Sequence, residues 1–157
     1  MDVRDIMILQ PTTVSPNDTV ATAVWQMNTH KVRNVFVVDD QHHLLGTLSA
    51  YQLTKVVLPM AASLSQSRLN SLDFVNYDME ALQERLLGMR ERRVWDVMEP
   101  LESIPVAYAD TPIVQGVLML HHSRTRVAVV NAHNVLIGAI TYRRLMSLIH
   151  RDFEEHS

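Results

Sequence analysis

Apolar and polar positions alternate along this chain in a pattern that occurs twice. Residues 34–49 contain two apolar runs, rich in β-branched residues, around a polar turn, which predicts a β-hairpin. Residues 127–141 repeat that order. The two copies are 92 positions apart (138 − 46 = 92), as these matching pairs show: Gly46 and Gly138, Asp18 and Asp110, Met27 and Met119, Leu53 and Leu145. An internal repeat of this kind determines the architecture.

Helical periodicity precedes and follows each hairpin. Between residues 19 and 30 apolar residues recur at the i, i+3, i+4, i+7 spacing of an amphipathic helix. A broader apolar stripe covers 111–120, and further helical patterns run from 50 to near 59 and from 142 to about 153. With a short strand candidate at 12–14, each copy is predicted to run strand, helix, strand, strand, helix.

The predicted fold class is α/β (α+β), with two βαββα repeats packed as a pseudo-two-fold pair. A copy of roughly 60 residues buries too little apolar surface to be comfortably stable alone. Two copies docked sheet to sheet would share one core. Repeat 1 is assigned to 1–60, a linker with an inserted helix to 61–93, repeat 2 to 94–153 and a tail to 154–157.

The linker has no counterpart in the other half of the chain. Residues 61–70 are polar and serine-rich and predict a connector. A helix is predicted after it, and the run 90–93 (Arg-Glu-Arg-Arg) is interpreted as its solvated last turn, where cations suit the helix dipole. The sequence leaves open whether this helix folds back over its own chain or extends a contact between chains. Its apolar face is formed by Met79, Leu82, Leu86 and Met89.

Composition argues against several classes of function. The 157 residues carry a net charge of −3 and no long basic run, so nucleic acid is not the expected partner. The absence of cysteine excludes disulfide and thiolate chemistry. No signal peptide and no apolar run near the roughly 20 residues that cross a bilayer are recognised. We therefore expect a cytoplasmic protein without a membrane partner.

The polar residues do not form a catalytic or metal-binding pattern. Eight histidines include the adjacent pairs 42–43 and 121–122, but none has the spacing of metal ligands. The sequence contains no Walker loop, no G-x-S-x-G elbow and no G-x-G-x-x-G motif. We expect no metal, no cofactor and no catalysis.

Short motifs recur at matching places in both copies, and their order and spacing resemble the tandem CBS-domain family, named for cystathionine β-synthase. The resemblance covers nearly the whole chain except the linker. The motifs are Asp5-Ile6-Met7 and Asp96-Val97-Met98, Ser15-Pro16-Asn17-Asp18-Thr19-Val20 and Asp110-Thr111, Val35-Phe36-Val37-Val38-Asp39, Gly46-Thr47-Leu48-Ser49 and Gly138-Ala139-Ile140-Thr141.

The resemblance implies a regulatory role rather than an enzymatic one. Proteins of this family are expected to bind adenosine derivatives in clefts between paired repeats, which suggests AMP, ADP, ATP or S-adenosylmethionine as a regulatory ligand. It also implies a homodimer and a separate effector protein. The alternative is a dimeric protein-interaction scaffold whose clefts have lost the ligand.

The resemblance also assigns residues to the cleft. Asn34 and Arg126 precede the central strands and should face it. The strands that open each copy line the base pocket in the family, although core packing is the alternative for their apolar members. These positions are Thr13, Val14, Ile104 and Val106.

Each glycine-containing strand ends in a hydroxyl residue, Ser49 or Thr141, which is a helix cap first and a phosphate contact second. In the family an aspartate three residues later holds the ribose hydroxyls. This chain has Gln52 and Arg144 at those positions. Neither provides a carboxylate, although Gln52 could still accept one hydroxyl or complete a capping box with Ser49.

Two adjacent arginines begin the last helix. Arg143 and Arg144 face the positive end of the helix dipole, which costs about 0.3–1 kcal/mol for each cation. A phosphate bound to the free N–H groups and the guanidinium groups would offset that cost. The alternatives are two solvated arginines, or an ion pair with an acid such as Asp110.

Surplus apolar residues predict a homodimer interface. Trp25 lies off the core stripe of its helix, and the helix near 111–120 is apolar over more than the roughly 100° that one sheet covers. We expect Trp95 to pack against the docked half instead. The predicted interface residues are Trp25, Val117, Leu118 and Leu120.

Overall fold

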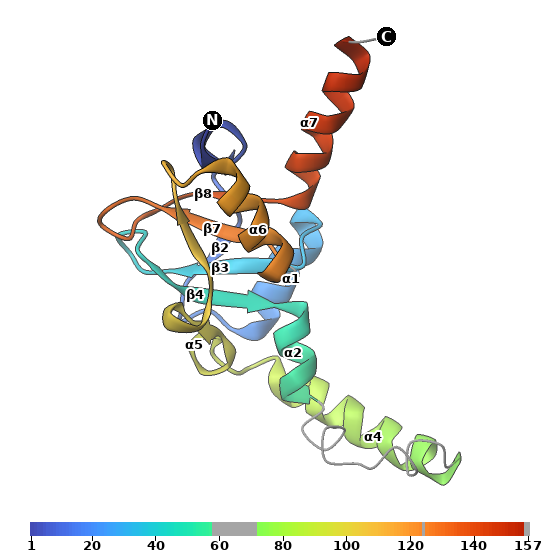
Figure 1. Cartoon of the computed structure of the whole chain (residues 1–157). Coiled ribbons are helices and arrows are strands. Elements are labelled where there is room, and N and C mark those ends of the chain that lie inside the picture. Colours follow the sequence, from blue (N-terminus) through green and yellow to red (C-terminus); the bar gives the residue numbers. More distant parts are fainter. Residues whose placement is uncertain (58–71, 124, 156–157) are drawn as a thin grey trace.

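The fold consists of two four-stranded sheets packed face to face, with helices on their outer faces (Figure 1). The structure is a computed structural model and describes residues 1–57, 72–123 and 125–155. One sheet has the order β2 (Thr13–Val14), β3 (Asn34–Val38), β4 (Leu44–Ser49), β5 (Glu99–Pro100). The other has the order β1 (Ile8–Leu9), β8 (Leu136–Ile140), β7 (Val127–Val130), β6 (Val106–Tyr108). The predicted pair of α+β repeats is confirmed.

The helices predicted from periodicity are confirmed, and the structure adds the short helix Val94–Val97 and two 3-10 turns. The predicted connector at 61–70 lies outside the described residues. Two short 3-10 turns are η1 (Val3–Asp5) and η2 (Leu101–Ser103). The helices are α1 (Val20–His30), α2 (Ala50–Val57), α4 (Leu72–Met89), α5 (Val94–Val97), α6 (Ile113–Ser123) and α7 (Tyr142–Glu155).

Side-chain alternation along the central strands separates three layers of core. In β3, Val35 and Val37 pack with α1, whereas Phe36 packs against the other sheet. β7 shows the same alternation, because Val129 packs with α6 and Ala128 lies between the sheets. The predicted shared core is confirmed and consists of Phe36, Val38, Leu44, Ala128, Val130, Leu136 and Ala139.

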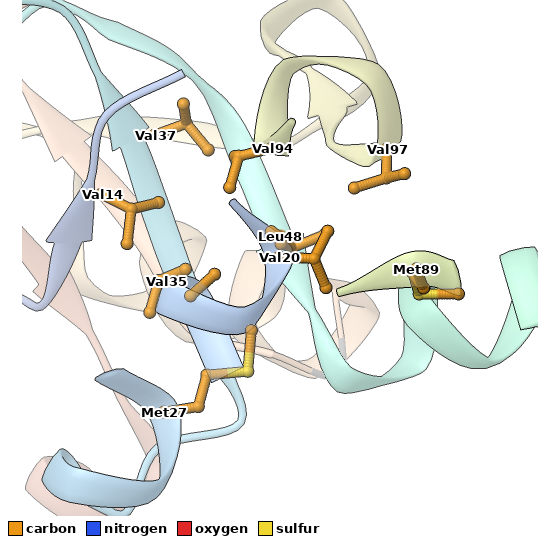
Figure 2. Packing of buried hydrophobic residues seen from close by; sticks show 10 residues of the cluster. Val14, Val20, Met27, Val35, Val37, Leu48, Met89, Val94 and Val97 are labelled. Atoms are coloured by element: carbon orange, nitrogen blue, oxygen red, sulfur yellow. The ribbon is translucent and has the colours of Figure 1, made fainter. Parts of the chain in front are cut away.

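The opening segments of the two repeats are exchanged. β1 comes from the first repeat and pairs antiparallel with β8 of the second, while β5 comes from the second repeat and pairs with β4 of the first. Val3 and Ile6 are accordingly buried in the second repeat's core. Val94 and Val97 are buried in the first repeat's core, beside α1 and β3 (Figure 2). Neither repeat has a complete core without the other.

Gly46 and Gly138 lie where the exchanged strands pass closest. A Cβ atom on Gly46 would overlap the carbonyl oxygen of Glu99 in β5. A Cβ atom on Gly138 would lie 2.6 Å from the carbonyl oxygen of Ile8 in β1. The repeated glycine is therefore explained by the exchange, because only a residue without a side chain leaves room for the crossing backbone.

The basic run at 90–93 has a different role from the one predicted. The helix α4 ends at Met89, so these residues lie beyond its last turn. The carbonyl oxygens of Arg90 and Arg92 accept hydrogen bonds from Ala21 N (3.1 Å) and Val20 N (2.9 Å). These two N–H groups belong to the first turn of α1 and would otherwise lack partners. The run therefore completes the start of α1 through its backbone, and its side chains remain exposed.

The C-terminal part of α4 folds back over its own chain. Met89 is buried against the first repeat's core and Leu82 packs beside it (Figure 2). Met79 and Leu86 on the same helix remain exposed. Figure 1 shows the rest of α4 extending away from the body. This resolves the alternative that the sequence left open for the docked part of the helix.

The predicted interface residues divide into two groups. Leu120 is 0% exposed within its own chain, and Val117 packs against the same core, so the assignment of Leu120 to a contact between chains is wrong. Trp25 and Leu118 are 61% and 53% exposed. Trp95 is 58% exposed, so the prediction that it packs against the other half is also wrong.

A membrane-spanning helix is not found in the part of the chain that the structure describes, since none of its helices combines the required length and apolar character.

Candidate ligand-binding cleft

The two repeats start their final helices at the same end of the sheets. β4 leads into α2 and β8 into α7, whereas both hairpin turns lie at the opposite end (Figure 1). The predicted caps are confirmed, because Ser49 Oγ accepts from Gln52 N (3.0 Å) and Thr141 Oγ1 accepts from Arg144 N (3.1 Å). A cleft of about 1330 Å³ lies between these two helix starts and is lined by residues of both repeats. Two further cavities, of about 670 and 540 Å³, are smaller.

Arg126 connects the two repeats at the wall of this cleft. Its Nε donates to Asn34 Oδ1 and its NH2 group to the Asn34 carbonyl oxygen, both at 2.8 Å. The two residues are 92 positions apart, so equivalent positions of the repeat meet each other. The guanidinium also lies 5.3 Å from the centre of the Phe36 ring, within cation–π range. Burial lowers the pKa of Arg126 to about 10, and the group stays cationic at neutral pH.

Asn34 is itself fixed by the strands around it. It is 2% exposed, and its Nδ2 donates to Thr47 Oγ1 at 3.3 Å. Thr47 in turn donates to the carbonyl oxygen of Val35 at 3.0 Å. The polar groups of this junction therefore have partners despite their burial, which holds the Arg126 side chain in one orientation.

Positive charge dominates the cleft. The cleft is lined by Lys31, Arg33, Arg126, Arg143 and Arg144, and none of its described lining residues is Asp, Glu or His. The first turns of α2 and α7 carry no acidic residue. Among the described residues no carboxylate pairs with Arg143 or Arg144, so the predicted alternative of a pair with Asp110 is not realised. Arg144 Nε is buried and has no hydrogen-bond partner.

The structure brings together six of the eleven residues that the sequence assigns to nucleotide binding. Their segments lie far apart in the chain, and the cleft brings them together at the ends of β4 and β8 and at the starts of β3 and β7. The six are Asn34, Ser49, Arg126, Thr141, Arg143 and Arg144.

The other five lie elsewhere. Val14 is buried in the first repeat's core, and Thr13 lies beside Phe36 in the sheet. Val106 packs against the core between the sheets. Gln52 lies one turn into α2 outside the cleft lining, and the described hydrogen bonds include its backbone N–H but not its side chain. Ile104 lines a smaller cavity of about 540 Å³, which shares Arg126 with the larger one.

Sequence reasoning missed two of the cations. Lys31 is the C-cap of α1 and has a left-handed conformation with φ 54°. Arg33 lies two residues later, directly before β3. Both precede Asn34, which the sequence had placed in the cleft, so the basic run that leads into that strand was the available signal. The aromatic residues Tyr51 and Tyr142 also line the cleft, one at each helix start.

The family model of the CBS domain matches this chain twice, at residues 3–59 and 94–151. The chain belongs to the CBS domain family. It contains two CBS domains, and the segment between the two matches includes α4. A comparison with curated protein sequences finds no match.

Solved structures share the fold at low identity. CBSX2 from Arabidopsis thaliana has a TM-score of 0.73 at 23% identity, with 98% of this chain and 96% of that chain covered. CBSX2 in complex with AMP gives 0.68 at 24%, covering 96% and 97%. The CBS domain pair of protein MJ0100, in complex with 5′-methylthioadenosine and S-adenosylmethionine, gives 0.65 at 15%, covering 97% and 98%.

A longer structure also matches. Protein MJ1004 from Methanocaldococcus jannaschii has a TM-score of 0.69 at 16% identity, and 96% of this chain corresponds to 60% of that chain. These likenesses describe a shared tandem CBS fold.

Proposed function

We propose that this tandem CBS protein is a non-catalytic regulatory module that binds an adenine nucleotide in the larger cleft. The observation that carries the proposal is the basic lining between two helix N-termini, where N–H groups and guanidinium groups suit a phosphate. AMP in the CBSX2 complex, and the adenosine derivatives in the MJ0100 complex, support the same class of ligand. S-adenosylmethionine is the second ligand to test.

The position of the cleft suggests how binding would regulate. Both repeats contribute to the lining, and Arg126 joins them at its wall. A ligand that contacts both helix starts stabilises the docked arrangement of the repeats, and the stabilisation grows with the logarithm of ligand concentration above the Kd. A separate effector protein would then respond to the occupied state. The described part of the lining offers no carboxylate, histidine or cysteine for acid–base or nucleophilic chemistry, which supports a binding role.

Isothermal titration calorimetry with AMP, ADP, ATP and S-adenosylmethionine tests the ligand class. We expect saturable heat with at least one adenine nucleotide and a matching rise in melting temperature, because a ligand that binds the folded state stabilises it. If none of the four gives heat or a melting shift at millimolar concentration, the nucleotide proposal is rejected.

Arg144→Ala is expected to weaken nucleotide binding by about tenfold or more, since a charge-assisted hydrogen bond to phosphate is removed. The unfolding midpoint should stay close to that of the wild type, because the side chain forms no ion pair with a described carboxylate. Arg151→Ala is the matched control, as Arg151 is exposed on the same helix and lies outside the cleft lining. Equal loss in both variants would point to general charge rather than to the cleft.

A dimeric interaction scaffold is the second candidate, favoured by two exposed apolar side chains. Trp25 on α1 and Leu118 on α6 are more than half exposed. Large apolar side chains that are exposed in a single chain often contribute to interfaces. We propose that both are buried in a homodimer. The scaffold differs from the sensor in requiring no ligand, so the calorimetric screen above separates the two.

Sedimentation velocity tests the homodimer. We expect a wild-type dimer at tens of micromolar, and a shift to monomer in Trp25→Ala and in Leu118→Glu, which are measured separately because the two residues lie on helices of different sheets. Trp95→Ala is the control, since Trp95 is equally exposed but lies outside the predicted interface. A wild type that stays monomeric would contradict the homodimer.

A further inference from the structure

Cations gather in the cleft, although the chain as a whole has more acidic than basic residues. Seventeen acidic residues outnumber fourteen lysines and arginines in the sequence. Among the residues that the structure describes, five of the lysines and arginines line the larger cleft and no acidic residue does. Inside a concave, partly buried site such charges reinforce one another and attract anions. A single phosphate monoester carries less charge than this lining can balance.

The positive charges are also poorly compensated by their neighbours. Arg126 donates to two neutral oxygens of Asn34 and keeps its full charge. The buried Nε of Arg144 has no acceptor. The dipoles of α2 and α7 add positive potential at the same place. No acidic residue in either first turn offsets that potential. The cleft therefore presents several separate positions for anionic oxygens.

The described lining of the cleft provides no carboxylate for a ribose diol. A carboxylate that accepts a hydrogen bond from each hydroxyl would favour ribose over deoxyribose, because deoxyribose lacks one of the two hydroxyls and leaves one carboxylate oxygen without its hydrogen bond. None of the residues that the structure places in the lining is an aspartate or glutamate. The residues three positions after the two caps are Gln52, which lies outside the lining, and Arg144, which is a cation.

We propose that the cleft selects its ligand by the number of phosphate groups and does not discriminate between ribose and deoxyribose. The ligand class is a nucleoside di- or triphosphate whose phosphate chain supplies most of the affinity. This inference rests on the proposed nucleotide-binding function and adds the basis of selection at the same site.

Calorimetry with AMP, ADP, ATP, dATP and inorganic tripolyphosphate, without divalent cations, tests the proposal. Each added phosphate should tighten binding about threefold to tenfold, the effect of one more charge-assisted contact. The dATP affinity should lie within about twofold of that for ATP, since no charged acceptor is lost. Raising NaCl from about 50 to about 300 mM should weaken ATP binding by about tenfold, because the attraction is screened.

The double substitution Arg143→Gln with Arg144→Gln tests whether this site is responsible. It should reduce the difference between AMP and ATP to about twofold or less, because the removed charges are those proposed to contact the added phosphates. Arg151→Gln is the control for position on the same helix and should keep the wild-type difference. Circular dichroism melting of both variants shows that the fold is retained.

The outcomes separate this inference from the proposed function. Equal affinities for AMP and ATP, or a preference of about tenfold for ATP over dATP, would overturn the selection rule and leave nucleotide binding in place. If adenine nucleotides fail to bind while tripolyphosphate binds through Arg143 and Arg144, the proposed function is wrong, and the nucleoside phosphate ligand class falls with it. No heat with any of the five probes would overturn both.

Discussion

Gly46→Ala and Gly138→Ala are each expected to destabilise the fold by about 2–3 kcal/mol, near the upper end of overpacking costs. The added Cβ meets a backbone carbonyl, that of Glu99 or that of Ile8, rather than the flexible end of a side chain. Both carbonyls belong to strands held in register by pairing with β4 and β8. The chain can relieve the overlap only by moving an exchanged strand. Urea denaturation followed by circular dichroism measures the effect.

Gly88→Ala is the matched control for these substitutions. Gly88 lies in α4, and a Cβ added there would enter open space, so alanine should stabilise the helix by about 0.5–1 kcal/mol. The same chemical change is thus expected to have opposite signs at different sites. Unchanged denaturation midpoints for Gly46→Ala and Gly138→Ala would mean that the exchanged strands move aside at little cost. That result would contradict the prediction that the close backbone contact at these glycines is rigid.

Phe36→Ala is expected to cost about 3–5 kcal/mol, the range for a fully buried aromatic side chain. Phe36 is 1% exposed and is among the largest side chains that are fully buried. It belongs to the layer between the sheets, so its loss leaves a cavity at the junction of the two repeats. It also removes the ring that faces Arg126. Chemical denaturation at equilibrium gives the change in free energy of unfolding.

Tyr108→Ala provides the comparison, because Tyr108 is also an aromatic residue on a strand but is exposed. It should cost about 1 kcal/mol or less. If Phe36→Ala prevents folding, Phe36→Leu keeps part of the volume and should lose about 1–1.5 kcal/mol. A loss as small as that of Tyr108→Ala would show that the layer between the sheets contributes little to stability.

The duplicated unit was predictable because its signals are local. A hairpin, an amphipathic stripe and a cap depend on residues within a few positions of each other, so 34–49 and 127–141 could be interpreted from their own sequences. Ser49 and Thr141 were predicted as caps for the same reason, and the hydrogen bonds at 3.0 and 3.1 Å confirm both. The 92-residue interval between Gly46 and Gly138 then implied that both copies share one architecture.

The cleft was predictable only in part. The resemblance to CBS domains placed the residues next to the repeated glycine motif of each copy, and those at the ends of β4 and β8 do line it. Lys31 and Arg33 lie in the short loop that joins α1 to β3, and they reach the cleft because that loop leads into Asn34, which meets Arg126 of the other repeat. Ile104 reached a different cavity because η2 and β6 run along the other side of Arg126.

By itself, the sequence determined the strand, helix, strand, strand, helix order of each copy, the repeat and the two helix caps. Periodicity shows that a helix has an apolar face but not which flank a neighbour covers, so it did not separate buried Leu120 from exposed Leu118. The tertiary structure decided that β1 and β5 cross to the opposite repeat, and that Arg126 bonds to Asn34 at the pseudo-two-fold junction. These contacts join segments about 50 to 130 residues apart, and long-range pairing of this kind depends on how the sheets dock rather than on any local pattern.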